Sequence, residues 1–151
     1  MENNNHKLTA TGIHLGILTQ YIIPFGNFIV PIILWSIGSK KSEFINHNGK
    51  QVINFQLSVF VYSAIMCIIT IPIIIFSIMK NVLISQYTEN GDFYVQKIDF
   101  ANLSVIGSIG ILLILFLIIM KIAEIFLAIY GAVKASNGIL WKYPFTINFI
   151  K

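Results

Sequence analysis

The sequence predicts an all-α integral membrane protein, a three-transmembrane-helix bundle with a kinked first helix and an amphipathic C-terminal tail. Hydrophobic residues make up 56% of the 151 residues and charged residues only 11%, a composition more apolar than that of soluble domains. The apolar residues also form long runs, at 59–79 and 105–120, whose lengths suit a hydrocarbon layer about 30 Å thick. We therefore expect one transmembrane domain over residues 1–151, in the cytoplasmic (inner) membrane.

Helix-breaking residues determine the expected shape of the helices. The three helices are expected over residues 8–37, 50–79 and 103–134. Pro24 and Pro31 each lack a backbone donor and Gly26 adds conformational freedom, so the first helix should kink near Pro24. Pro72 should bend the second helix in its later part.

The segments outside the helices are an extramembrane loop at 81–102 and the C-terminal tail. Asn90-Gly91 is a strong two-residue turn signal between β-prone runs, which predicts a small hairpin in the loop. Gly138 can end the third helix, and Tyr143-Pro144 prevents its continuation. The tail is rich in aromatic residues, which suits it to the headgroup layer.

The distribution of lysines predicts an orientation. Three spans would place the linker 38–49 and the tail on one side of the membrane. The basic residues on that side are Lys40, Lys41, Lys50, Lys134, Lys142 and Lys151, opposed by Glu43 alone. The other side carries more acidic residues than lysines, so the C-terminus is expected in the cytoplasm and the N-terminus outside.

The chain carries no recognisable catalytic motif, so we expect that it is not an enzyme and has no cofactor. Cys67 is the only cysteine, and the three histidines fall on two sides of the predicted bundle, so no metal site is expected. The lysines form no basic stripe, which argues against a nucleic-acid partner.

Four polar residues share one face of the second helix because they are spaced by three and four residues. They are Gln51, Asn54, Ser58 and Tyr62. Polar side chains in lipid tend to face other helices, so this set predicts a polar helix–helix face. The alternative is a polar groove or a surface for a partner protein.

Lys121 and Glu124 lie one helical turn apart in the third helix, close enough to form an intramembrane charge pair. Ionisable residues at membrane depth cost about 2.5 to 3.5 kcal/mol each, which makes them functional candidates. Snorkelling of both side chains to the headgroups is an equally weighted alternative, because the helix is longer than the hydrocarbon layer.

Two strings, HLGILTQYIIPFGNFIVPIILWSIGSKKSEFINHNGKQVINFQLSVFVY at 14–62 and YGAVKASNGILWKYPFTINFIK at the C-terminus, resemble the bacterial DUF4870 family, which is also described as Tic20-like. The residues that carry the resemblance are Pro24, Gly26, Asn27, Phe44, His47, Gly49, Lys50, Gln51, Asn54, Phe55, Gln56, Gly131, Ala135, Gly138, Tyr143 and Pro144. The resemblance implies a small helical protein of the cytoplasmic membrane. A role in protein translocation or complex assembly is implied only by analogy.

The leading functional hypothesis is a non-enzymatic membrane subunit or assembly factor that binds another integral membrane protein. The alternative is a small transporter or channel formed by a homo-oligomer, with Lys121 and Glu124 along its path. The expected binding surface for a partner or membrane lipid contains His47, Lys50 and Tyr143, on segments that leave the membrane at the same interface. Simple anchoring in the headgroups is an equally weighted reading of these residues.

Overall fold

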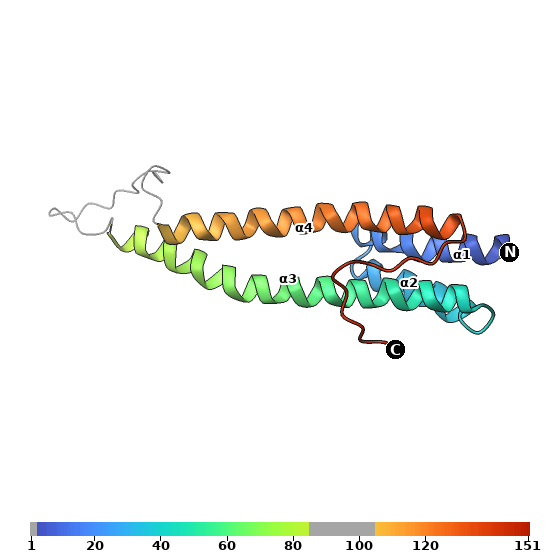
Figure 1. Cartoon of the computed structure of the whole chain (residues 1–151). Helices are drawn as coiled ribbons and strands as arrows, with labels where there is room; N and C mark the ends of the chain where they lie inside the picture. The colour runs from blue at the N-terminus through green and yellow to red at the C-terminus, as the bar shows by residue number, and fades with distance from the viewer. Residues whose placement is uncertain (1–2, 85–104) are drawn as a thin grey trace. The chain divides into compact units, whose positions relative to one another are not determined.

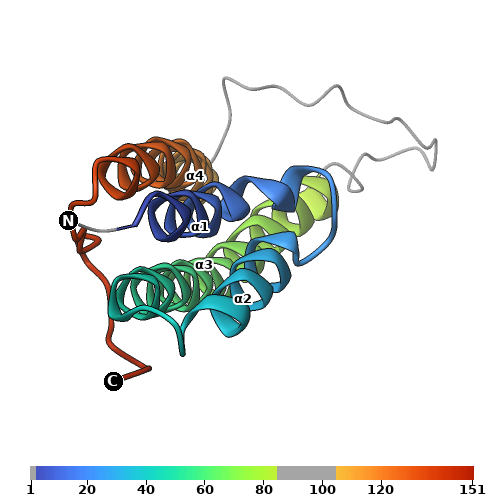
Figure 2. The same cartoon turned by 90° about the vertical axis from the view of Figure 1, so that its right-hand side faces the viewer.

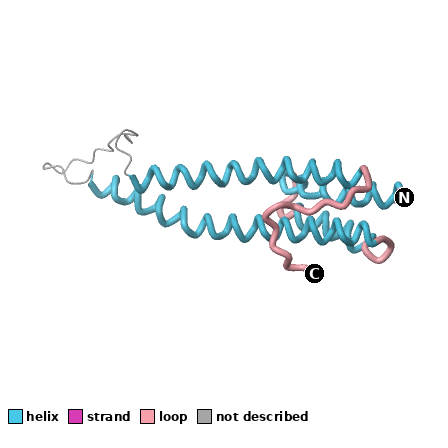
Figure 3. The backbone as a smooth tube through the Cα atoms, viewed as in Figure 1, coloured by secondary structure: helices cyan, strands magenta, loops and turns pink. Residues whose placement is uncertain are grey.

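The computed structural model describes residues 3–84 and 105–151, which form helices and loops without a β-strand. The helices are α1 (Asn4–Leu15), the 3-10 helix η1 (Gly16–Tyr21), α2 (Gly26–Gly38), α3 (Glu43–Ile84) and α4 (Val105–Ser136) (Figures 1 and 3). The predicted all-α class is thus confirmed for these residues. The hairpin expected at Asn90-Gly91 lies outside the described residues.

Two helices, rather than three, contain a stretch long and apolar enough to cross a membrane among the described residues. These stretches are Glu43–Ser77 in α3 and Gly107–Ser136 in α4. The helix Gly26–Gly38 is apolar but shorter. The predicted count of three spans is therefore not confirmed.

The region 8–37 forms a helical hairpin instead of the expected single kinked helix (Figure 2). Backbone N–H groups of Ile22 and Ile23 both donate to the Thr19 carbonyl, which ends η1, and Phe25 adopts a left-handed conformation with φ 60°. A Cβ at Gly26 would lie only 2.7 Å from the Thr19 carbonyl oxygen, so the turn requires glycine. The proline-containing segment thus reverses the chain where a kink was predicted.

The chain divides into two compact units, which are described separately. Unit 1 comprises Met1–Tyr62 and Lys121–Lys151, and therefore includes the hairpin, the start of α3, the end of α4 and the tail. Unit 2 comprises Ser63–Met120.

Unit 1 contains the main hydrophobic core. Its buried members come from α1, η1, α3, α4 and the tail, and are Ile13, Ile17, Ile45, Val52, Phe55, Val59, Ala128 and Tyr143. Glycines allow close approach of the helices here: a Cβ at Gly49 would overlap the Trp35 ring, and one at Gly38 would lie 2.8 Å from Ile45. The core therefore depends on small residues on the helix faces that meet.

The start of α1 and the end of α4 lie at the same end of unit 1. Gly138 follows α4 with φ 75°, and its N–H donates to the Ala135 carbonyl while that of Ile139 donates to Lys134, an arrangement that ends the helix. A Cβ at Gly138 would lie 2.9 Å from Lys7 Cε, so the first turns of α1 lie beside the end of α4.

Unit 2 has few buried side chains among its described residues. Gly110 of α4 approaches Ile74 of α3, to which its Cβ would come within 3.0 Å. Large apolar side chains such as Ile68, Phe76, Leu112 and Ile119 are exposed. Such a surface suits lipid rather than water.

Candidate functional site

A buried chain of hydrogen bonds connects α1, α3 and the tail in unit 1. His14 Nδ1 lies 2.6 Å from the Tyr143 hydroxyl, and His14 Nε2 lies 2.9 Å from Asn48 Oδ1. Asn48 Nδ2 donates to the Phe44 carbonyl at 2.8 Å. His14 and Asn48 are fully buried and Tyr143 nearly so. Three segments far apart in the sequence thus share one polar cluster.

The partners of Asn48 determine the tautomer of His14. Because the Asn48 amide nitrogen donates to a carbonyl, its oxygen must accept, so His14 carries its proton on Nε2. His14 Nδ1 then accepts from the Tyr143 hydroxyl. Each polar side-chain atom of His14, Asn48 and Tyr143 has at least one hydrogen-bond partner, as is usual for buried polar groups.

Burial keeps the two titratable members of the cluster neutral. It lowers the pKa of His14 to about 4, an effect opposed by the hydrogen bond to Asn48 and reinforced by nearby His47. Burial also raises the pKa of Tyr143, and the Glu124 carboxylate adds to that rise. Neither group exchanges a proton near neutral pH.

The space for this cluster is provided by Gly131 of α4. A Cβ at this position would lie 2.6 Å from His14 Nδ1 and 2.9 Å from the Tyr143 hydroxyl. On its other side Tyr143 stacks on Phe55, with ring centroids 4.2 Å apart. The tyrosine is therefore held between α3, which stacks on its ring, and α4, which lies beside its hydroxyl.

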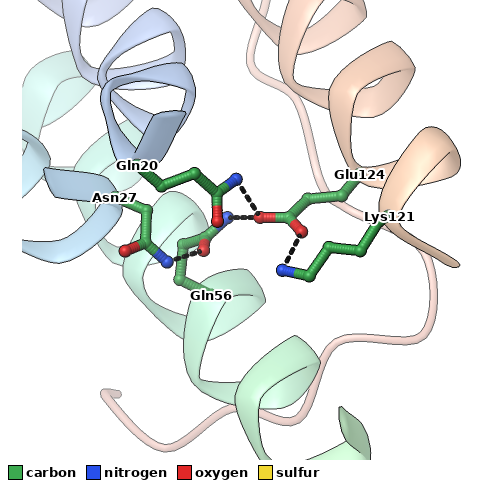
Figure 4. A network of polar contacts seen from close by, with 5 residues as sticks. All are labelled: Gln20, Asn27, Gln56, Lys121 and Glu124. Atoms are coloured by element: carbon green, nitrogen blue, oxygen red, sulfur yellow. Dashed lines mark hydrogen bonds and ion pairs between the residues drawn. The ribbon is translucent and has the colours of Figure 1, made fainter. Parts of the chain in front are cut away.

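A second polar network surrounds Glu124 (Figure 4). One carboxylate oxygen accepts from Gln20 at 3.1 Å and from Gln56 at 3.0 Å, and the other accepts from Lys121 Nζ at 2.8 Å. Asn27 donates to Gln56 Oε1 at 2.6 Å. Gln20 and Asn27 flank the turn of the hairpin, so this network joins the hairpin to α3 and α4.

The Lys121–Glu124 charge pair expected from the sequence is present, but its two members differ in environment. Glu124 is 1% exposed, whereas about half of the Lys121 side chain is accessible. The lysine can therefore reach outward while its ammonium group stays on the carboxylate. The carboxylate itself is enclosed by protein donors.

The polar face of α3 contacts the C-terminal tail rather than another helix. Asn54 forms a reciprocal pair with Ile150, donating to its carbonyl at 3.0 Å and accepting from its N–H at 2.8 Å. Ser58 accepts from the Ile147 N–H at 2.8 Å, and the Tyr62 hydroxyl donates to the Phe145 carbonyl at 3.0 Å.

This stripe explains how an extended tail can lie against an apolar helix. Non-helical backbone next to lipid is tolerated only where its polar groups find partners. Asn54, Ser58 and Tyr62 provide partners for four backbone groups of the tail: the Phe145 carbonyl, the Ile147 N–H, and the N–H and carbonyl of Ile150. Gln51 is half-buried and its Oε1 has no partner among the described residues.

The proposed binding trio His47, Lys50 and Tyr143 does not form a common exposed surface. His47 and Lys50 are half-buried on α3. Tyr143 is 2% exposed and belongs to the core. The aromatic tail therefore places this residue inside unit 1, and only the first two remain candidates for contact with a partner.

Several residues of these networks were not singled out by sequence reasoning as members of a site. They are His14, Gln20, Asn27, Asn48 and Gln56. The sequence did indicate them, because they are polar side chains within apolar segments, and polar side chains in lipid tend to face protein. Sequence spacing could not show which partners they would meet.

The described residues contain no group of three or more histidine, cysteine, aspartate or glutamate side chains that could hold a metal ion. The buried groups bond to one another instead.

Comparison with known proteins identifies a family. The model of the magnetosome magnetite crystal formation protein family (MamF/MmsF) matches residues 5–150. No curated protein and no solved structure matches the chain. The DUF4870 or Tic20-like identification is corrected by this family match.

Proposed function

The chain belongs to the magnetosome magnetite crystal formation protein family, and from this premise we propose that it is a non-enzymatic membrane protein that assembles with another membrane protein. Family membership and two helices long and apolar enough to cross a membrane indicate a membrane location. The crystal formation for which the family is named would then depend on this chain as a subunit or assembly factor.

One observation carries the non-enzymatic part of this proposal. The side chains best suited to acid–base chemistry, His14, Tyr143 and Glu124, are all buried and bonded to other protein groups. A catalytic group must reach the proton or atom on which it acts. Such internal pairing supports a role in holding the hairpin, α3, α4 and the tail together.

The same pairing argues against the alternative of a transport path through Lys121 and Glu124. Both Glu124 oxygens already accept hydrogen bonds, and its side chain has no accessible surface. A path for a polar solute would need to expose this carboxylate. Glu124 instead links α4 to η1 and α3 through its hydrogen bonds to Gln20 and Gln56, which supports a role in helix association.

The orientation that we propose places both termini on the cytoplasmic side. Lys40 and Lys41 lie in the linker after α2 and Lys134 lies in the last turn of α4, which favours the cytoplasm for that end of unit 1. Lys7 lies beside Gly138 at the same end. The N-terminus is therefore assigned to the cytoplasm, in place of the outside location expected from three spans.

The test is copurification of the full chain in mild detergent, followed by mass spectrometric identification and quantification. We expect a different membrane protein in stoichiometric amount. Substituting both His47→Ala and Lys50→Ala should reduce that protein several-fold, because these half-buried residues remain available at the cytoplasmic end. The Lys40→Ala variant is the matched control, since Lys40 is an exposed lysine in the neighbouring linker.

Thermal unfolding of each variant must match that of the wild type, so that a loss of partner reflects the surface and not the fold. Recovery of a homo-oligomer alone, or of the bare chain after cross-linking in intact membranes, would overturn the proposed assembly role. Retention of the partner by the double variant would overturn the assignment of this surface.

A further inference from the structure

The second arm of the α1–α2 hairpin is too short to cross a membrane. The 13 residues of α2 extend about 20 Å at roughly 1.5 Å per residue, which is short of the approximately 30 Å of hydrocarbon. The two arms lie side by side: Gly12 of α1 faces Leu34 of α2, and Gly38 lies near Thr9. The chain therefore returns to the end from which it started (Figure 2).

The tip of the hairpin is apolar on its outside. Ile22 is 84% exposed and Phe25 is 72% exposed, and Tyr21 and Ile23 are also exposed. A loop that ended in water would be expected to present polar side chains there.

The polar groups beside the tip point the other way. Gln20 donates to Glu124 and Asn27 donates to Gln56, so both amides are directed into unit 1 (Figure 4). The Thr19 hydroxyl donates to the Gly16 carbonyl of its own helix. The backbone N–H groups of Ile22 and Ile23 donate to the Thr19 carbonyl, and that of Gly26 donates to the Ile23 carbonyl, so these donors are bonded within the turn. Polar side chains directed inward and apolar side chains directed outward are expected of a segment surrounded by hydrocarbon.

The open end of the hairpin has the opposite character. Lys40 and Lys41 lie in the linker after α2, and Lys7 lies in the second turn of α1. Between the ends, α2 exposes Ile29, Ile32, Ile33 and Ile37. Polarity thus falls from the open end to the tip, as it does from the headgroups to the centre of a bilayer.

We infer that α1, η1 and α2 form a re-entrant hairpin whose exposed face is covered by the acyl chains of a single leaflet, with its tip ending inside the hydrocarbon. The parts of α3 and α4 that belong to unit 1 also expose large apolar side chains, at Phe60, Ile122 and Phe126. Because these helices contain the stretches able to cross a membrane, lipid is the occupant that suits hairpin and helices alike. This inference is independent of the assembly role.

The experiment measures collision of a nitroxide label with oxygen and with a water-soluble nickel chelate. The full-length chain carries Cys67→Ala together with Ile22→Cys, and is reconstituted in vesicles of phosphatidylcholine and phosphatidylglycerol. Labels at Asn4→Cys and Lys40→Cys, exposed positions at the open end, are the controls. We expect the Ile22 label to collide several-fold more with oxygen than with nickel, and the control labels to show the reverse.

Access of nickel to the Ile22 label at the level of the controls would overturn the inference, because the tip would then reach water on one side or the other. An immobilised label shielded from both reagents would also overturn it, because a protein or a second copy would then cover the tip. Ile23→Cys provides a second position if the first variant fails to fold.

The sidedness of the hairpin is checked with a membrane-impermeant maleimide on the two control cysteines in oriented vesicles. Both must be labelled from the same side. Labelling from opposite sides would mean that one arm crosses the bilayer, and the re-entrant hairpin would be excluded.

Discussion

The hydroxyl of Tyr143 lies 2.6 Å from Nδ1 of His14, a residue 129 positions earlier in the chain. This contact fastens the C-terminal tail to the first helix inside unit 1. Removing the hydroxyl in Tyr143→Phe leaves a buried acceptor without a donor, and we expect a loss of about 1 kcal/mol in stability. Thermal unfolding in detergent measures it. Tyr21→Phe, at an exposed tyrosine, should leave the midpoint unchanged; equal midpoints for the two variants would contradict this role.

A methyl group at Gly131 should disrupt the same cluster. The Gly131→Ala Cβ would lie 2.6 Å from His14 Nδ1, so the ring or α4 must shift, at a cost of about 1 to 3 kcal/mol. Gly12→Ala is the matched control, since its Cβ meets only Leu34 at an ordinary 3.4 Å. The control should be neutral or more stable, because alanine favours helices. If the unfolding curves of Gly131→Ala and Gly12→Ala coincide, the proposed clash between the new methyl group and His14 is refuted.

Protonation of His14 should destabilise the folded chain. Its pKa is about 4 in the folded state and near 6.5 when exposed, so between these pH values the unfolded state binds the extra proton. Stability is therefore fully present above about pH 6.5 and falls as the pH is lowered toward 4, by on the order of 3 kcal/mol. Unfolding midpoints measured across this range should drop for the wild type and for His6→Ala. The unfolding midpoint of a His14→Leu variant should depend much less on pH. If its midpoint falls with pH as much as that of the wild type, a group other than His14 causes the fall.

The interaction between Glu124 and Lys121 should contribute to the stability of unit 1. In Glu124→Gln the new amide oxygen can still accept from Gln20 and Gln56. The new amide nitrogen would then face the Lys121 ammonium, and because both groups are donors they cannot bond to each other. Lys121→Met leaves a buried carboxylate oxygen without its donor, and we expect each single change to cost about 1 to 3 kcal/mol, because about half of the Lys121 side chain is exposed and the pair is not fully buried. The double variant should be more stable than the sum of the two losses predicts. Strict additivity in the unfolding free energies would show that the two residues do not act as a pair.

Breaking the Asn54 pair should release the end of the tail. Asn54→Leu removes both hydrogen bonds to Ile150, and carboxypeptidase should then remove the last residues several-fold faster than from the wild type. Asn148→Ala is the control, because Asn148 is an exposed residue of the same tail. Identical digestion rates for Asn54→Leu and the wild type would mean that these bonds do not retain the tail.

Composition and periodicity were sufficient to predict the helical class and the apolar stretches of α3 and α4, because long apolar runs must be hidden from water whatever their partners are. The helical spacing also placed Asn54, Ser58 and Tyr62 on one face and Lys121 beside Glu124. These are local properties, determined by the 3.6-residue period within one helix.

The partners across the chain were decided only by the tertiary structure. Pro24 and Gly26 predicted an interruption, but whether a helix kinks or reverses depends on what its two arms pack against, here Gly16 against Pro31 and Thr19 against Gly26. The polar face of α3 was expected to meet other helices, but its side chains bond to the backbone of the tail. Every residue has backbone donors or acceptors, so the residue types of the tail did not indicate this pairing. Tyr143 was predicted to lie at the surface because aromatic residues favour the interface, yet a glycine in α4 opened room for it beside His14. These three outcomes depend on contacts between segments that are far apart in the sequence. Sequence spacing does not predict such contacts, because the energy of a hydrogen bond does not depend on how many residues separate its donor from its acceptor.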